Sequence, residues 1–197
     1  MKKVVITAII VFSTIISQAQ VSADKSAHLL FKGVPIDGTL NEYVLMMEKN
    51  GFSHIGTENG AAMLKGDFAS FKNCIVGVAT QKQKDLVSQI TVVFPDCDTW
   101  SSLYSNYLTL KELLTEKYGK PSNIVEKFQT TSRPEDDNSK FYEVQFDRCK
   151  YYTIFETEKG TIQLSIEHVD VSRCFVMLTY WDRINGKSIR DKAIDDL

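Results

Sequence analysis

Four cysteines and three histidines are the side chains in this chain best suited to nucleophilic or metal chemistry. A cysteine or serine nucleophile needs a histidine within hydrogen-bond reach, and a zinc site needs closely spaced cysteines and histidines. The chain has no C-x-x-C pair, no G-x-S-x-G turn and no histidine beside a cysteine in the sequence. We therefore predict no metal, no cofactor and no catalytic residue among His28, His54 and His168. His168 ends an alternating apolar pattern, which is typical of a partly buried residue at a strand end.

Carboxylates and glycines add no catalytic signature. With 25 acidic residues in the chain, a glycosidase-like pair can always be found, so such a pair is uninformative. The acidic segment 134–138 lacks the alternating spacing and the glycine of a calcium-binding loop. No glycine pattern of a phosphate-binding or dinucleotide-binding loop is present.

Aromatic side chains crowd the last third of the chain and are the best candidates for a binding surface. Strand alternation prevents all of them from facing one core, so some are expected on an open face. Exposed tyrosine and tryptophan anchor protein interfaces and also stack on sugars. An aromatic core is the alternative. The candidate binding residues are Tyr151, Tyr152, Tyr180 and Trp181.

The first nineteen residues predict a secretory signal peptide. Lys2 and Lys3 precede an apolar run from Val4 to Ile16, and 17–19 supply small residues before a cut at Gln20. The apolar run is too short for a comfortable bilayer span, and no second one follows, so we expect no transmembrane segment in the mature chain. We expect the protein to be exported to the periplasm or the cell surface.

Export makes disulfide bonds the favoured chemistry of the cysteines. An even number of cysteines in an exported chain indicates disulfides. We favour Cys74–Cys97 with Cys149–Cys174 among the three possible pairings, because each bond then lies within one half of the chain. Four buried free thiols are the alternative, since free cysteine packs as a small hydrophobe.

Composition and charge are those of an ordinary folded domain. Removal of residues 1–19 leaves 21 basic and 25 acidic residues, a net charge of −4. This mild balance gives no basic surface for nucleic acid, so we predict no nucleic-acid partner. Residues 20–197 are long enough for one domain with a sizeable core.

Two amphipathic helices and a set of short strands are predicted. Thr39 and Glu42 have capping-box spacing before an apolar face, and Asn50-Gly51 ends that helix. A second helix runs from about Thr99 to Tyr118, where Gly119 and Pro121 stop it. Strands are expected at 63–68, 72–80, 87–94, 141–146, 150–157, 161–167 and 174–181. The last is apolar on both faces, which predicts a central strand or part of an interface. The polar segment 129–140 is expected to be a surface loop or a long hairpin tip, and 186–197 a short terminal helix.

The order of these elements predicts an α+β fold with an antiparallel sheet and helices on one face. Links between the strands are too short for crossover helices. The strings LNEYVLMMEKNG and LTLKELLTEKYG both place an apolar helix before Glu-Lys-x-Gly, and strands follow each. We therefore predict two loosely repeated helix-plus-strand units, at 33–97 and 98–183, within a single domain.

Four strings resemble a family of exported proteins of gut Bacteroidales-type bacteria that has no assigned activity: DGTLNEYVLMMEKNGF, LKGDFASFKNC, FPDCDTWSSLYSNY and KYGKPS. The resemblance covers most of the mature chain and implies export. The expected architecture also resembles, at the level of fold alone, the β-lactamase-inhibitor protein and small outer-membrane assembly lipoproteins. Those fold types bind other proteins, but the chain has no cysteine at the predicted cut to carry a lipid anchor.

A non-enzymatic interaction module of the bacterial envelope is the function that this sequence favours. Its partner is expected to be a protein or a glycan, which would contact the free face of the sheet or the 129–140 loop. Two alternatives stay open, a small-ligand or lipid-binding domain with a pocket between helices and sheet, and an enzyme of unrecognised type.

Overall fold

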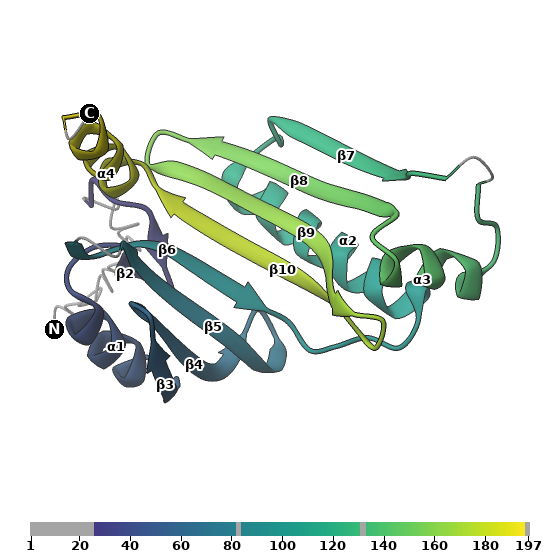
Figure 1. The fold of residues 1–197 in the computed structure, drawn as a ribbon, viewed down its shortest axis with the longest axis horizontal. Coiled ribbons are helices and arrows are strands. Elements are labelled where there is room, and N and C mark those ends of the chain that lie inside the picture. The colour runs from purple at the N-terminus through teal and green to yellow at the C-terminus, as the bar shows by residue number, and fades with distance from the viewer. Residues whose placement is uncertain (1–25, 82–83, 131–132, 196–197) are drawn as a thin grey trace, which may run out of the picture.

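One eight-stranded antiparallel sheet forms the body of the molecule, and α1 and α2 pack on the same face of it (Figure 1). The computed structural model describes residues 26–81, 84–130 and 133–195, so the predicted signal peptide lies outside the described residues. The strand order is β3-β4-β5-β6-β10-β9-β8-β7, and β1 and β2 form a separate pair. The strands are β1 Leu30–Phe31, β2 Val34–Pro35, β3 Ser53–Glu58, β4 Ala61–Phe68, β5 Phe71–Gln81, β6 Lys84–Val93, β7 Asn123–Phe128, β8 Cys149–Thr157, β9 Gly160–Asp170 and β10 Arg173–Asp182, and the helices are α1 Leu40–Lys49, α2 Trp100–Tyr118, α3 Asp137–Gln145 and α4 Arg183–Asp195.

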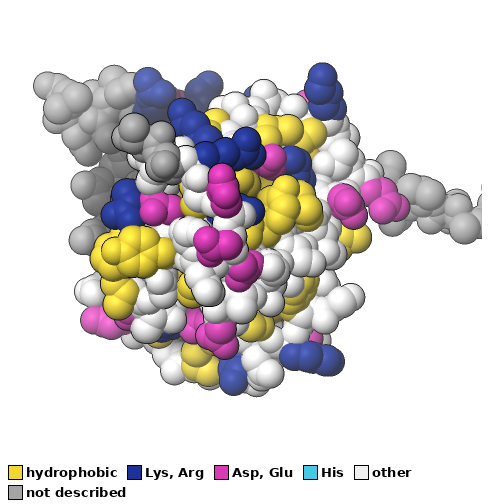
Figure 2. Space-filling view, turned by 90° about the vertical axis from the view of Figure 1, so that its right-hand side faces the viewer, with side chains coloured by type: hydrophobic (Ala, Val, Ile, Leu, Met, Phe, Trp, Pro, Cys, Tyr) yellow, Lys and Arg dark blue, Asp and Glu magenta, His cyan; other side chains and the backbone are white. Residues whose placement is uncertain are grey.

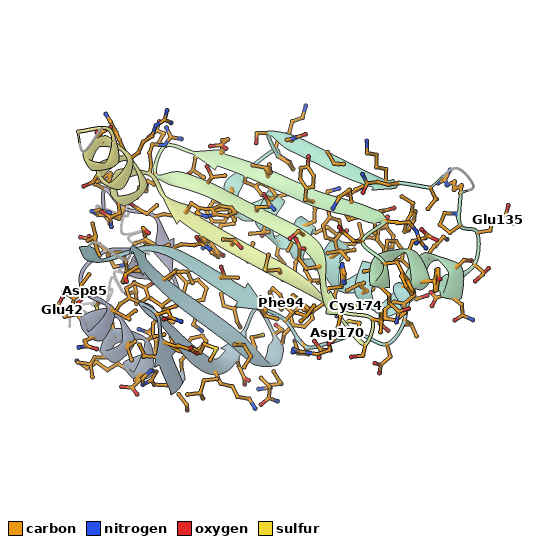
Figure 3. All side chains as sticks on the ribbon, in the orientation of Figure 1. Glu42, Asp85, Phe94, Glu135, Asp170 and Cys174 are labelled. Carbon is orange, nitrogen blue, oxygen red and sulfur yellow. The ribbon has the colours of Figure 1, made fainter. Side chains whose placement is uncertain are left out.

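Helix α1 begins and ends where the sequence predicts. Thr39 and Glu42 form the reciprocal capping box, and Asn50 is the C-cap. A carboxylate from the start of β6 adds to the start of the helix, because Asp85 accepts a hydrogen bond from the Leu40 amide at 2.9 Å. Figure 3 shows Glu42 and Asp85 at the same end of α1. Both acids lie at the positive end of the helix dipole, which their charge stabilises.

Helix α2 covers the half of the sheet that β8, β9 and β10 make, and it is seen behind these strands in Figure 1. Thr99 caps it by accepting a hydrogen bond from the Ser102 amide, as the sequence allows. The predicted stripe is buried against the sheet, and its residues are Leu103, Tyr107, Leu110 and Leu114. Tyr107 also bonds to the Thr153 hydroxyl of β8 at 2.5 Å. The helix is therefore fixed to the sheet by both apolar and polar contacts.

The predicted strand at 141–146 is wrong, because this segment belongs to helix α3. Asp136 caps the helix by accepting a hydrogen bond from the Ser139 amide at 2.9 Å. Asp137 then accepts a hydrogen bond from the Ser101 amide of α2 at 2.7 Å, which ties the start of α3 to that helix. In the helix, Tyr142 and Phe146 lie on the exposed side, and Val144 points to the opposite side and is buried. Part of the expected 129–140 loop is thus helical.

Strands β3 and β7, the two edges of the sheet, were missed by the strand prediction. Almost all side chains of these two strands are exposed, so their sequences lack the alternation of apolar and polar residues by which a half-buried strand is recognised. The central position of β10 is confirmed, because it pairs with β6 on one side and β9 on the other.

The sheet joins two successions of elements at its centre. Helix α1 precedes β3 to β6, helix α2 precedes β7 to β10 with α3 inserted, and the final strands of the two successions pair with each other. An origin of the two halves in one repeated unit stays a prediction. Their shared central pair means that β3 to β6 and β7 to β10 belong to one sheet.

Helix α4 follows β10 directly and starts three residues before the predicted 186–197 helix. A buried polar network lies at this junction. Asp182 accepts hydrogen bonds from the Leu29 amide at 2.8 Å and the Asn185 amide at 2.9 Å. The Asn185 side chain donates in turn to the carbonyl oxygens of Ile36 and Val87. The N-terminal strands, β6 and α4 are thereby connected through two side chains.

Candidate functional site

The candidate site is the sheet face opposite α1 and α2, which we call the open face. Cross-strand register identifies its central residues, because directly opposed residues of antiparallel strands share a face. Thr91 of β6 and Gln163 of β9 both oppose Thr179 of β10, and Tyr152 of β8 opposes Ser165 of β9. The central residues are Ile75, Gly77, Ala79, Gln89, Thr91, Val93, Tyr152, Ile154, Thr161, Gln163, Ser165, Met177, Thr179 and Trp181.

The centre of the open face carries no charged side chain. Its side chains are small, apolar, aromatic or neutral polar, and most are half-buried. Charges lie at its margin. Lys65 opposes Ile75, Glu167 follows Ser165 on the same side, and Glu156 accepts a hydrogen bond from Thr161 at 2.9 Å. An uncharged centre with a charged rim is the anatomy of protein interfaces.

Trp181 is the largest exposed side chain at the centre of the open face, with 36% of its surface accessible. It lies on the central strand β10, flanked by Gln89 on β6 and Thr161 on β9. Next to it lies a row of residues with short or no side chains, which are Gly77 of β5, Thr91 of β6 and Thr179 of β10. Little side-chain bulk therefore lies beside the Trp181 ring, and Thr179 itself is buried.

The four predicted aromatic site residues divide between the two faces of the sheet. Tyr152 and Trp181 belong to the open face. Tyr151 points to the helix side, where its ring lies 5.1 Å from Trp100 of α2 and 5.6 Å from Phe128. Tyr180 is 3% exposed and packs edge-on against Phe31. The core alternative therefore holds for Tyr151 and Tyr180.

Several central residues of the open face were missed as candidates, including Met177, Thr179 and Gln163. The alternation of β9 did separate Gln163 from the apolar side of that strand. Strand β10 is apolar on both faces, so its sequence gave no sign of which side was open. The missing signal is strand register, which depends on contacts between distant segments.

A second group of exposed apolar side chains lies at the end of the molecule that α3 and the β9–β10 turn form (Figure 2). The Tyr142 and Phe146 rings of α3 lie 4.3 Å apart, and Arg148 stands over both at 5.3 Å. Arg148 is itself paired with Glu143 at 2.7 Å. This end carries charge beside its aromatics, unlike the centre of the open face.

The favoured disulfide pairing does not fit the sheet. All four cysteines are buried and unbonded. Cys149 lies on β8 and Cys174 on β10, with β9 between them, so their Cα atoms are about 9.6 Å apart. Cys74 is next to Ile75, and Ile75 opposes Val93 of β6. Cys97 lies four residues beyond Val93, so it is not opposite Cys74. A disulfide needs Cα atoms within about 7 Å, and neither pair meets this condition without movement.

The environment of Cys149 is opposite to that of an activated nucleophile. Burial raises the pKa of this thiol to about 12. His168 is a half-buried residue near the end of β9, as expected, and its Nε2 atom lies 3.9 Å from Asp147. Among the described residues, no group of three or more His, Cys, Asp or Glu side chains is arranged to hold a metal ion.

The reduced protein should react slowly with thiol reagents at pH 8. Because pH 8 lies far below the raised pKa of Cys149, the thiolate fraction should be about a thousandfold lower than for an ordinary thiol of pKa 9. The thiol ionises more readily in the unfolded chain, so stability should fall as pH rises above about 9. Iodoacetamide labelling followed by peptide mass spectrometry measures the rate, with urea-unfolded protein as the control. Equal labelling of Cys149 in both states would contradict the burial.

The geometry defines an α+β protein with an eight-stranded antiparallel sheet, whose face opposite α1 and α2 has an uncharged centre. Comparison with family models, with curated proteins and with solved structures finds no match. Within the described part of the chain, none of the helices has the length and apolar character needed to span a bilayer.

Proposed function

We propose that this protein is an exported, non-enzymatic interaction module that binds another protein through its open face. The uncharged centre around Trp181, surrounded by a charged rim, is the observation that supports this proposal. Trp, Tyr and Met are enriched at interface cores, and this centre has one of each in Trp181, Tyr152 and Met177. Export is supported by the signal-like sequence of residues 1–19.

Photo-crosslinking tests the proposal directly. A benzophenone amino acid is placed at Gln163 or Thr91 on the open face, and at exposed Glu112 of α2 as the matched control. After incubation with an envelope extract, we expect the two open-face positions to crosslink to the same protein and the α2 position not to. Crosslinking from Glu112 alone would place the interface on the helix side. Periodate-sensitive capture would instead identify a glycan as the partner.

Trp181→Ala should weaken binding of the crosslinked protein by at least about tenfold. The ring is exposed at the centre of the face, where truncation of an aromatic commonly costs more than 1.4 kcal/mol of binding free energy. Surface plasmon resonance with the identified partner gives the dissociation constant. Leu113→Ala on α2 changes an apolar residue that is 46% exposed; it is the control and should leave binding unchanged. Equal losses in the two variants would remove Trp181 from the interface.

A ligand-binding role is the second candidate, because the helix–sheet interface is not fully sealed. An apolar cavity of about 390 Å³ is lined by Leu29, Leu30 and Tyr118, and a neighbouring one of about 120 Å³ shares Tyr118 and Lys117. The larger volume lies within the range of small-molecule sites. Lys117 and Lys159 lie at its wall together with Glu158, which favours a single-chain amphiphile with an anionic head.

Dodecanoate is the probe for this second role. We expect it to bind with a dissociation constant that rises at least tenfold in Leu30→Trp, because the larger ring fills the cavity. Isothermal titration calorimetry measures the constant, and Leu45→Trp on the exposed side of α1 is the control. Equal heats for the parent protein and Leu30→Trp would exclude this cavity as the site.

A further inference from the structure

Cys97 and Cys174 face each other at the end of the central strand pair. They form an isolated antiparallel bridge beyond β6, in which the Cys97 amide donates to the Cys174 carbonyl oxygen at 2.8 Å. Both side chains are buried. Figure 3 shows Cys174 close to Phe94, the residue that follows β6, and the Phe94 amide donates to the Val176 carbonyl oxygen at 3.0 Å. This pairing joins residues from the two halves of the chain.

The bridge has the separation that a disulfide requires. Directly opposed residues of a hydrogen-bonded antiparallel pair have Cα atoms about 5.5 Å apart, and their side chains lie on the same face. Disulfides form at Cα separations of about 4.4–6.8 Å.

We propose that Cys97 and Cys174 form a disulfide bond when the protein folds in the presence of a thiol oxidant. The oxidant is an external disulfide such as oxidised glutathione. One cysteine thiolate attacks it and releases a glutathione thiolate, and the second cysteine thiolate displaces the other glutathione to form the sulfur–sulfur bond. The two cysteines lose two protons and two electrons, and the external disulfide becomes two thiols.

Cys97 is the better attacking group of the two. The side-chain amide of Asn106 on α2 donates to its sulfur at 3.3 Å, and such a donor favours the thiolate. Burial raises the pKa of both thiols, that of Cys174 to about 11. Oxidation is therefore expected during folding, before the sulfur atoms are covered.

The bond would close a chain segment that runs from Cys97 to Cys174 and contains α2, β7, α3, β8 and β9. A cross-link over such a long segment strongly restricts the unfolded chain. It would also fix the start of β10 to the chain that leads from β6 into α2. The proposal does not depend on the open face or on the identity of a binding partner.

Trypsin mapping tests the proposal, because the four cysteines fall in four different peptides. Cleavage after lysine and arginine gives the peptides 73–82, 85–111, 149–150 and 174–183. The protein is refolded in a buffer of oxidised and reduced glutathione, and its native fold is checked by circular dichroism. It is then unfolded in urea with iodoacetamide, so that every free thiol is blocked, and digested. We expect one reducible link, between 85–111 and 174–183. The same digest of protein purified from an oxidising bacterial periplasm, without refolding, should give the same link.

Matched variants complete the experiment. Cys74→Ser and Cys149→Ser should retain the 85–111 to 174–183 link, and Cys97→Ala and Cys174→Ala should lose it. Reduction should lower the Tm of the parent protein by about 10 °C and leave that of Cys97→Ala unchanged. Four alkylated thiols in natively folded protein from both preparations would overturn the proposal. A reducible link that involves 73–82 or 149–150 would overturn it equally.

Discussion

Tyr180→Ala should lower the free energy of unfolding by about 3–5 kcal/mol, whereas the neighbouring change Trp181→Ala should lower it by less than about 1 kcal/mol. The two residues are adjacent in β10 and point to opposite faces. Tyr180 is 3% exposed and its ring lies 5.5 Å from that of Phe31, so its removal leaves a cavity between the N-terminal strands and the sheet. Trp181 is 36% exposed and lies outside the hydrophobic core cluster, so its removal opens no cavity in the core.

Urea denaturation followed by far-UV circular dichroism measures both values. Tyr180→Phe is the control for cavity formation, because it keeps the ring and removes only the hydroxyl, which interacts with Tyr118. We expect this variant to lose about 1 kcal/mol. A large loss of stability in Trp181→Ala would mean that this residue is part of the core and does not belong to the open face.

Asp182→Ala should lower the free energy of unfolding by about 3–4 kcal/mol. The carboxylate is 2% exposed and accepts from two backbone amides, those of Leu29 and Asn185. It also contacts the His28 ring at 3.1 Å. Alanine leaves buried donors without an acceptor, and each unsatisfied group costs about 1–3 kcal/mol. The N-terminal segment and the start of α4 would lose their common attachment.

Thermal unfolding and hydrogen exchange measure this effect at two levels. The fall in stability should appear as a lower Tm, and faster exchange should appear first at the amides of Leu29 and Asn185. Asp182→Asn is the matched variant, since its single carbonyl oxygen can satisfy one donor but its amide group opposes the other. We expect about half of the loss seen for alanine. An unchanged exchange rate at Leu29 would show that this amide does not depend on Asp182.

Local patterns in the sequence were sufficient for the helices that begin at clear caps. Thr39 with Glu42, and Thr99 before an apolar stripe, specify their helices through contacts within four residues. Alternation was likewise sufficient for β9, where one side is apolar and the other polar. The antiparallel α+β architecture follows from these elements and their short connections.

Other features depend on contacts between distant segments, and the sequence could not specify them. Helix α3 was predicted as a strand because Tyr142, Val144 and Phe146 follow the strand period of two, whereas in the helix Val144 faces the core and the two aromatics face outwards. Its hydrogen bond to Ser101 of α2 joins it to a segment distant in the sequence. The edge strands β3 and β7 have no buried side. Their pairing comes from the neighbouring strand rather than from their own composition.

The sequence predicted an aromatic binding surface on the sheet, but it did not predict which aromatic residues form that surface. The sequence indicated that aromatics would lie on both faces, and the structure shows that Tyr152 and Trp181 lie on one face and Tyr151 and Tyr180 on the other. The same limit applies to the cysteines. Grouping them by half of the chain ignored β9, which separates Cys149 from Cys174, and the bridge that brings Cys97 opposite Cys174.

The position of β10 has a consequence for how the chain acquires its structure. This strand joins the two halves of the sheet, yet it ends at Asp182 and is the last strand to leave the ribosome. During synthesis, β6 and β9 therefore cannot pair with β10, the strand between them, until nearly the whole polypeptide has been made. Until β10 is made, β6 and β9 each keep one unpaired edge, and an unpaired strand edge can pair with another chain.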